Sequence, residues 1–279
     1  MPLRQRQEIQ EVPRSGLTST LTPERYASLA LEVAAEAGML LLGGYRKRPT
    51  PTEKARHDLV TEFDLKSEAL IVERLRTATP ELGIVAEEGG GVQKPLSWFC
   101  DPLDGTMNFV HGHPFWSVSI GLLDGGRPVA GAVVAPALGL TWIGFQGGLS
   151  RRGDEICHVS ETSELGDALL ATGFPPDRQT APGNNLDTFV RAQKVARGVR
   201  RCGSAAIDMC LVADGTYDAY WERRLNAWDL AAGAAIVLAA GGTISALDGG
   251  AVDLSIGHII ASNGRIHTQL QAVVTASSS

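Results

Sequence analysis

Two carboxylates flank a proline-leucine step in the run Asp101-Pro102-Leu103-Asp104-Gly105-Thr106, which directly follows the apolar segment 98–100. Pro102 fixes φ, and we expect it to end regular strand pairing. Gly105 permits a turn that a larger residue would strain, so both carboxylates can converge on one point. Hard divalent cations need oxygen ligands held in this way, and the Leu103 carbonyl is a further oxygen between the two acids. The run also fits a capped turn at a strand end.

Three further acidic elements lie elsewhere in the chain. Glu87-Glu88 ends an apolar segment, and adjacent carboxylates repel each other unless a cation joins them. Asp229 opens an apolar helix, which is a usual N-cap position, and the small residues behind it indicate tight packing. The third element is 58–61 with Asp64. Taken singly, each element fits a solvated or capping role as well as a functional one.

The apolar pattern predicts the elements that carry these acids. Thr22-Pro23 has the N-cap and first-turn residues of a helix that runs to about Tyr45. A second helix is expected at 64–78, and strands are expected at 83–86, 97–100, 117–123, 128–134 and 140–145. Asp124-Gly125-Gly126 is a hairpin signal. We expect an antiparallel sheet that carries both helices.

From residue 165 the pattern alternates between strands and helices. Strands are expected at 168–172, 199–202, 217–222, 243–246 and 259–262, and helices at 186–197, 205–213, 229–240 and 266–274. Such alternation predicts a mainly parallel sheet with helices on both faces. We therefore expect a flexible arm at 1–20, an α+β domain at 21–164 and an α/β domain at 165–279.

Composition excludes several classes of protein. The chain has 279 residues, 44% of them hydrophobic, and its net charge of −6 argues against a nucleic-acid partner. Four cysteines without a C-x-x-C pair argue against disulfides and zinc. No secretory signal or membrane-length apolar run is present, so we expect a cytoplasmic protein without a membrane partner. P-loop and G-x-S-x-G motifs are absent from the sequence.

Five segments resemble, in their order along the chain, the inositol monophosphatase family of magnesium-dependent, lithium-sensitive sugar phosphatases. They are DLVTEFD (58–64), AEEG (86–89), WFCDPLDGTMNFVHG (98–112), RRCGSAA (200–206) and WDLAAG (228–233). The resemblance covers about residues 26–272. It implies a two-domain, layered αβαβα sandwich with the site between the halves, a homodimer, and hydrolysis of a phosphomonoester by metal-activated water.

The resemblance also implies roles for individual residues. Two or three Mg²⁺ ions per site are expected, with Glu88 near the most weakly held ion. Thr106 would bind the nucleophilic water with support from Asp64, and the backbone N–H groups of Gly105 and Thr106, where a short helix can start, would hold the phosphate. The metal ligands would be Glu87, Asp101, the Leu103 carbonyl, Asp104 and Asp229.

Residues outside the metal ligands would recognise the alcohol. By resemblance these are Gly203, Ser204, Ala205, Glu222 and Asp104, while Asp208 is a weaker candidate that is also explained by a structural role. Arg223-Arg224 departs from this picture, because two arginines could bind a second anionic group; a solvated surface or a subunit interface would also explain them.

The expected activity is hydrolysis of inositol 1-phosphate or a related polyol or sugar phosphate to the alcohol and phosphate. The alternatives are a phosphatase of the same family for fructose 1,6-bisphosphate, histidinol phosphate or NADP(H), and, in a different class, a regulatory binding protein built on this scaffold.

Overall fold

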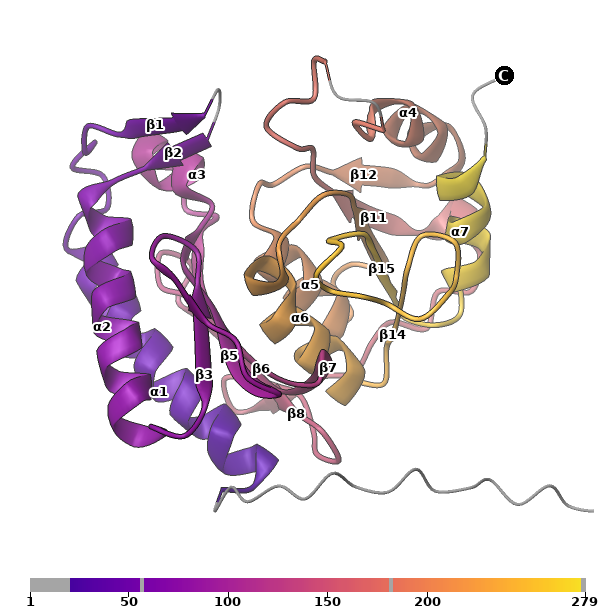
Figure 1. Cartoon of the computed structure of the whole chain (residues 1–279). Coiled ribbons are helices and arrows are strands. Elements are labelled where there is room, and N and C mark those ends of the chain that lie inside the picture. The colour runs from indigo at the N-terminus through magenta and orange to yellow at the C-terminus, as the bar shows by residue number, and fades with distance from the viewer. Residues whose placement is uncertain (1–20, 56–57, 181–182, 277–279) are drawn as a thin grey trace, which may run out of the picture.

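The structure is a computed structural model that describes residues 21–55, 58–180 and 183–276, so the arm expected at 1–20 lies outside the described residues. Two β-sheets face each other with a pair of helices between them (Figure 1). The helices are α1 (Pro23–Leu42), α2 (Glu62–Ala78), α3 (Thr106–His111), α4 (Leu186–Val195), α5 (Ala205–Ala213), α6 (Ala227–Ala239) and α7 (His267–Thr275), with a 3-10 turn, η1, at Leu165–Asp167.

Three sheets account for the strands of the described residues. The larger sheet has the order β10-β9-β8-β7-β6-β5-β3-β4, the smaller sheet has the order β12-β11-β13-β15-β14, and β1 (Thr52–Ala55) pairs with β2 (Asp58–Val60). The strands of the larger sheet are β3 (Gly83–Ala86), β4 (Gly90–Val92), β5 (Leu96–Asp104), β6 (Ser117–Asp124), β7 (Arg127–Ala135), β8 (Leu140–Phe145), β9 (Arg151–Arg152) and β10 (Glu155–Ile156). Those of the smaller sheet are β11 (Leu169–Thr172), β12 (Gly198–Arg200), β13 (Ala219–Glu222), β14 (Thr243–Ser245) and β15 (Ile259–Ser262).

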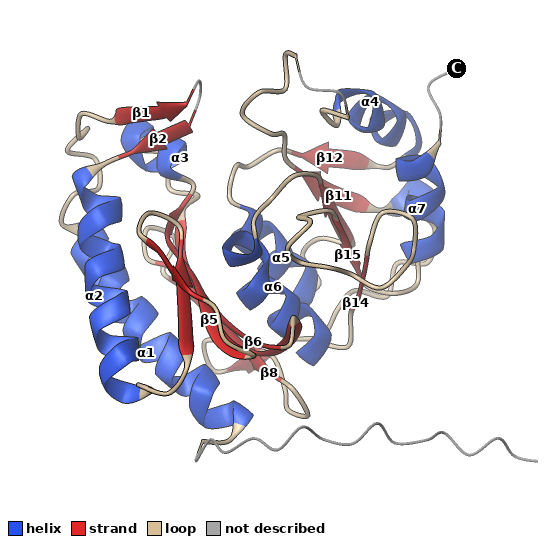
Figure 2. Cartoon of the chain, viewed as in Figure 1, coloured by secondary structure: helices blue, strands red, loops and turns tan. Residues whose placement is uncertain are grey.

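The layers follow the order helix, sheet, helix, sheet, helix (Figure 2). Helices α1 and α2 pack on the outer face of the larger sheet, α5 and α6 lie between the sheets, and α4 and α7 pack together beside the smaller sheet. The expected αβαβα sandwich is therefore confirmed. No helix in the described part of the chain is both long and apolar enough to cross a membrane.

Helix α2 begins earlier than the sequence predicts. Its N-cap is Thr61, whose hydroxyl accepts a hydrogen bond from the Phe63 N–H at 3.1 Å. The Asp64 carboxylate in turn accepts the Thr61 N–H at 2.8 Å, which completes a capping box. The motif that places Asp64 in the site is thus also the signal that starts the helix.

Strand β5 continues through Pro102, but its regular pairing with β6 is interrupted at this proline, as expected. The pairing with β6 becomes irregular between Asp101 and Asp104 and resumes where Asp104 faces Ser117. A bulge tolerates the fixed φ and the missing N–H of proline, and it redirects neighbouring side chains. The two acids therefore project from an irregular segment inside a strand.

The smaller sheet is mixed, and the expectation of a mainly parallel sheet is wrong for its second half. Strand β11 is parallel to β12 and β13, but β15 runs antiparallel to both β13 and β14. Helix α6 connects β13 to β14, whereas the chain between β14 and β15 forms no helix and returns the strand in the opposite direction. The alternating pattern did not show that β15 inserts between its two neighbours.

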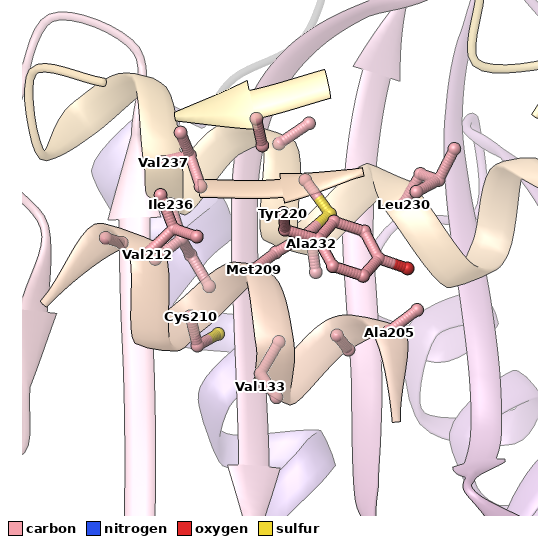
Figure 3. Close-up of a cluster of buried hydrophobic side chains, with 14 of the residues drawn as sticks. Val133, Ala205, Met209, Cys210, Val212, Tyr220, Leu230, Ala232, Ile236 and Val237 are labelled. Carbon is pink, nitrogen blue, oxygen red and sulfur yellow. The ribbon is translucent and has the colours of Figure 1, made fainter. Parts of the chain in front are cut away.

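A continuous hydrophobic core joins the two halves of the chain. Side chains of β7, α5, α6 and the smaller sheet gather in it, including Val133, Met209, Leu230 and Ile236 (Figure 3). The proposed boundary at 164/165 falls just before η1, and separate domains at 21–164 and 165–279 stay a prediction.

Glycines let α6 lie close to the larger sheet. A Cβ at Gly131 of β7 would come within 2.6 Å of the Ala232 Cα, and one at Gly121 of β6 within 2.4 Å of the Ala232 N. Only residues without a side chain fit at such a distance from a helix backbone. The tight packing predicted behind Asp229 is confirmed, and it holds the first turns of α6 against β6 and β7.

Candidate functional site

Four carboxylates lie near enough to influence one another's pKa where β3, β5 and α6 approach one another. Strands β3 and β5 are parallel neighbours, so Glu87, directly after β3, lies at the same edge of the sheet as Asp101 and Asp104. Asp229 lies in the first turn of α6. We call Glu87, Asp101, Asp104 and Asp229 the carboxylate cluster.

Burial and mutual repulsion disfavour charge in this cluster. Asp101 is only 2% exposed, and its pKa lies well above the ordinary value because of burial first and then the charges of Glu87, Asp104 and Asp229. Burial also raises the pKa of Asp229 well above its usual range, and Glu87 and Asp104 raise it further. Such a group of acids needs a compensating cation when it is ionised.

Asp104 belongs to the N-terminal half of the chain, but residues of the C-terminal half hold its carboxylate. Its Oδ2 accepts hydrogen bonds from the Ser204 hydroxyl at 2.5 Å and from the Ala206 N–H at 2.9 Å, both at the start of α5. Ser204 is also the N-cap of α5 and accepts the Ile207 N–H at 3.3 Å. The hydroxyl of Ser204 therefore orients a carboxylate, besides lining the pocket where we expected it.

The other acids of the cluster are fixed by local backbone. Asp101 Oδ1 accepts the Leu103 N–H at 3.0 Å, which closes the bulge of β5. Asp229 Oδ2 accepts the Asn226 N–H at 2.7 Å in a capping box. Asp229 is therefore not the N-cap that we expected: Asn226 is the N-cap of α6, and Asp229 is the N3 residue of the capping box.

The buried Asp64 and the half-buried Thr106 form a dyad beside the cluster. The Thr106 hydroxyl lies 2.9 Å from Asp64 Oδ1 and 3.0 Å from the Leu103 carbonyl. Asp64 is 1% exposed, and burial raises its pKa although its bonds to Thr61 lower it. The expected short helix is α3, which starts at Thr106 after Gly105 in the left-handed region at φ 92°.

One face of α2 holds two more segments of the site. Ser67 donates from its hydroxyl to the Pro102 carbonyl at 2.8 Å. The two oxygens of Glu68 accept the N–H groups of Glu88 and Gly89 at 2.7 and 2.6 Å. With Asp64, these residues occupy positions i, i+3 and i+4 of one helix face. Helix α2 therefore orients the dyad, the β5 bulge and the turn after β3 together.

Lys54 of β1 supplies the cation that joins the two adjacent glutamates. Its Nζ lies 2.8 Å from Glu87 Oε1 and 2.8 Å from Glu88 Oε1. Burial alone would lower the pKa of Lys54, but the bonds to both glutamates raise it on balance. Sequence reasoning missed this residue, because a lysine in a short polar hairpin gives no signal of its own.

A cavity of about 140 Å³ adjoins Asp104 and Asp229. Its wall includes Arg201, Gly203, Ser204, Ala205, Asp208 and Glu222. Every residue that we expected to bind the alcohol therefore lines this one cavity. Thr172, Gly173 and Leu225 also line it and were not predicted. A Cβ at Gly173 would lie 2.2 Å from Glu222 Oε2, so this glycine makes room for the carboxylate.

Glu222 is held at the end of β13 by its own strand. The Tyr220 hydroxyl donates a hydrogen bond to Glu222 Oε2. Burial raises the pKa of Glu222 to about 7, although the bond from Tyr220 and the charge of Arg201 oppose the rise. Near neutral pH this group can therefore accept a hydrogen bond, or donate one when protonated.

The consecutive arginines do not line this cavity. Arg224 makes a two-point ion pair with Asp177 at 2.7 and 2.9 Å. Arg223 donates to the carbonyl of Val274 in α7 at 3.2 Å. Both side chains are thus engaged by protein groups away from the cluster, which removes the reason for expecting a second anionic group there.

Asn108 of α3 is a further residue that sequence reasoning missed. Its Nδ2 donates to the Cys202 carbonyl at 2.8 Å and to the Phe115 carbonyl at 2.6 Å. This side chain ties the helix after Gly105 to the segment before Gly203, across the two halves. It lies inside the predicted motif, but its residue type alone gave no signal.

The chemistry of the donor groups fits a hard cation. The cluster offers only oxygen, without His or Cys, which suits Mg²⁺. Within the described residues, no three His, Cys, Asp or Glu side chains stand close enough together to form a ready metal site. The cluster therefore has the composition of a magnesium site and the repulsion that a cation would relieve, and its ligand geometry stays a prediction.

Comparisons with known proteins identify the family of the chain. A model of the inositol monophosphatase family matches residues 22–279. An inositol-1-monophosphatase of Synechocystis sp. is 42% identical over 267 residues, which are 91% of this chain and 90% of that protein. The Nus factor SuhB of Pasteurella multocida is 38% identical over 86% of this chain and 91% of its own length. The solved inositol monophosphatase of Anabaena superposes with a TM-score of 0.83 at 37% identity, over 90% of this chain and 95% of that one. The chain belongs to the inositol monophosphatase family.

Proposed function

We propose that this chain, a phosphatase of the inositol monophosphatase family, hydrolyses inositol 1-phosphate or a closely related polyol phosphate in a magnesium-dependent reaction. The observation that carries the proposal is that a cavity walled by Glu222 and Asp208 adjoins the carboxylate cluster at Asp104 and Asp229. A cation site beside a pocket for hydroxyl groups matches the two ends of a polyol phosphate.

Glu87, Asp101, Asp104, Asp229 and the Leu103 carbonyl would hold the magnesium ions. Bound Mg²⁺ would neutralise the phosphate, lower the pKa of a water molecule and stabilise the leaving alkoxide. The protein's part is to keep the acids oriented, and Ser204, the Leu103 N–H and the Asn226 N–H do so through the hydrogen bonds described above.

The dyad would orient the attacking water. Because Thr106 donates its hydroxyl hydrogen bond to Asp64 Oδ1 at 2.9 Å, an unshared electron pair of Thr106 Oγ1 can accept a hydrogen bond from that water. The first N–H groups of a helix have no partner within the helix, so those of Gly105 and Thr106 at the start of α3 would hold phosphate oxygens.

A phosphate-release assay tests the proposal. Purified protein is incubated with inositol 1-phosphate in Mg²⁺ or in EDTA, beside Asp101→Asn as the inactive control. We expect release only by the wild type with Mg²⁺. Fructose 1,6-bisphosphate, histidinol phosphate and NADP form the comparison panel, and a higher kcat/KM on any of them would replace the proposed substrate.

A regulatory binding role is a second candidate function. It is favoured by the similarity to the Nus factor SuhB of Pasteurella multocida, which spans 86% of this chain. The carboxylate cluster would not be needed for such a role. A partner that binds the wild type and Asp101→Asn equally well would support it, and loss of binding in that variant would count against it.

We also propose three further properties: inhibition by lithium and a homodimer, which rest on the family resemblance, and a cytoplasmic location, which rests on the sequence. Lithium titration of the phosphate-release assay and size-exclusion chromatography with light scattering test the first two. An uninhibited enzyme, or a monomer at micromolar concentration, would contradict the corresponding expectation. Fractionation of the source cells tests the third.

A further inference from the structure

Asp208 points to an additional contact with the substrate. It lies in α5, is 2% exposed and lines the cavity beside the carboxylate cluster. Its Oδ1 is buried and has no hydrogen-bond partner within the described part of the chain. Leaving a buried acceptor unpaired is unfavourable, so such an atom at a cavity wall is suited to a ligand that supplies the missing partner.

The charges around Asp208 define what that ligand can be. The pKa of Asp208 lies well above its usual range because of burial, Glu222 and Asp104, and Arg201 lowers it. The Arg201 side chain also lines this cavity, and its Nη1 lies against Gly203. A Cβ added to Gly203 would be 2.7 Å from that nitrogen. Among the residues that line this cavity, acids therefore outnumber the single arginine.

We propose that Asp208 is a substrate-binding residue that hydrogen-bonds a hydroxyl group of the alcohol, and that with Glu222 it restricts the pocket to polyhydroxylated alcohols without a second phosphate. The inference rests on the proposed function and narrows its substrate class. Hydroxyl groups satisfy carboxyl oxygens in either protonation state, because they donate and accept.

The acids that suit a hydroxyl group would repel a second phosphate group. It would approach Asp208 and Glu222, and among the described residues that line the cavity Arg201 alone would balance its charge. Arg223 and Arg224 are engaged with Val274 and Asp177 and do not line the cavity. The bisphosphate and NADP alternatives thus lack a site for their additional anionic group here.

The test compares substrates that differ in hydroxyl groups. Inositol 1-phosphate, fructose 1,6-bisphosphate and p-nitrophenyl phosphate, which has no hydroxyl group, are assayed with wild type, Asp208→Ala and Asp208→Asn. We expect Asp208→Ala to lower kcat/KM for inositol 1-phosphate by about tenfold more than for p-nitrophenyl phosphate, mainly through KM. For inositol 1-phosphate, the kcat/KM of Asp208→Asn should lie between those of Asp208→Ala and the wild type. Asp208→Asn should also improve turnover of the bisphosphate, because a negative charge is removed.

Asp218→Asn is the matched control. Asp218 is also a buried aspartate of the same half, but its oxygens accept from the Ser160 hydroxyl at 2.6 Å and the Leu169 N–H at 2.6 Å. We expect its loss to leave the ratio between the substrates as in the wild type. If Asp208→Ala and Asp208→Asn lowered turnover of all substrates equally, Asp208 would be structural and the inference would be wrong. A wild type that cleaved p-nitrophenyl phosphate but no inositol phosphate would instead overturn the proposed substrate, and the inference with it.

Discussion

Replacing Asp101 with asparagine should stabilise the metal-free protein while it removes activity. In the folded chain, burial and the charges of Glu87, Asp104 and Asp229 all disfavour the ionised form of Asp101. Asparagine has nearly the same shape, keeps an oxygen that can accept the Leu103 N–H at 3.0 Å and carries no charge. The substitution therefore removes repulsion without removing the local hydrogen bond.

The raised pKa of Asp101 gives the sign of the effect, and the usual range for stabilising substitutions gives its size. Each unit by which folding raises a pKa corresponds to about 1.4 kcal/mol of lost stability once the group is ionised. Relief of such functional strain commonly stabilises a protein by about 0.5–2 kcal/mol, and we expect about 1–2 kcal/mol at pH 8. For a chain of this size, that corresponds to a rise in Tm of roughly 2–8 °C.

The sign of the pH dependence is fixed by the direction of the shift. Because the folded pKa of Asp101 is raised, its penalty is absent below the unfolded value of about 4 and grows as the pH rises through the folded pKa. The advantage of asparagine should thus be smallest in acid and largest at pH 8. Saturating Mg²⁺ should reverse the order, since at about 100 times its Kd it stabilises the wild type by about 2.7 kcal/mol.

Thermal unfolding in EDTA and in Mg²⁺, between pH 4.5 and pH 8, measures these differences. Asp218→Asn is the control, because its carboxylate accepts bonds from Ser160 and Leu169 and its loss should destabilise the protein with or without Mg²⁺. Either of two results would contradict this prediction. Asp101→Asn in EDTA at pH 8 could melt at or below the wild-type temperature, or Mg²⁺ could leave Asp101→Asn with the higher melting temperature.

Three more substitutions test the positions around the cluster. Thr106→Val removes the hydroxyl that Asp64 holds and should lower kcat at least about 100-fold, while Mg²⁺ binding, measured by calorimetry, changes little. A similar loss of Mg²⁺ affinity would contradict the proposal that Thr106 orients the attacking water. Glu68→Gln replaces one of the two oxygens that accept the Glu88 and Gly89 N–H groups, so it should weaken Mg²⁺ binding by about tenfold. Glu73→Gln is an exposed control on the same helix. If Glu68→Gln and the wild type bound Mg²⁺ with equal affinity, the turn after β3 would not position a metal ligand. Glu222→Gln should cost about 1–3 kcal/mol of transition-state binding with inositol 1-phosphate but much less with p-nitrophenyl phosphate, and an equal loss on both substrates would argue against contact with the ring.

The local motifs predicted most of the elements and the residues of the site, because short-range chemistry determines them. The strands 83–86, 140–145 and 259–262 and the helix 205–213 match the structure at both ends. Thr22 caps α1 as expected, accepting the Arg25 N–H at 3.3 Å. These features depend on neighbouring residues, which the sequence displays directly.

Features that depend on distant residues were not predictable in the same way. The insertion of β15 between β13 and β14 is decided by packing, and the pattern of one strand does not reveal its neighbours. Lys54 reaches Glu87 only because β1 folds over the site. Ser67 and Glu68 stood at i+3 and i+4 from Asp64, a spacing that could have identified them as side chains of the same helix face.

Phosphate release from inositol 1-phosphate as a function of Mg²⁺ concentration tests the central claim most directly. We expect saturable release by the wild type, none in EDTA, and none at any Mg²⁺ concentration by Asp101→Asn although that variant is folded. A folded wild-type protein that bound Mg²⁺ but released no phosphate, or an Asp101→Asn variant with normal turnover, would contradict it.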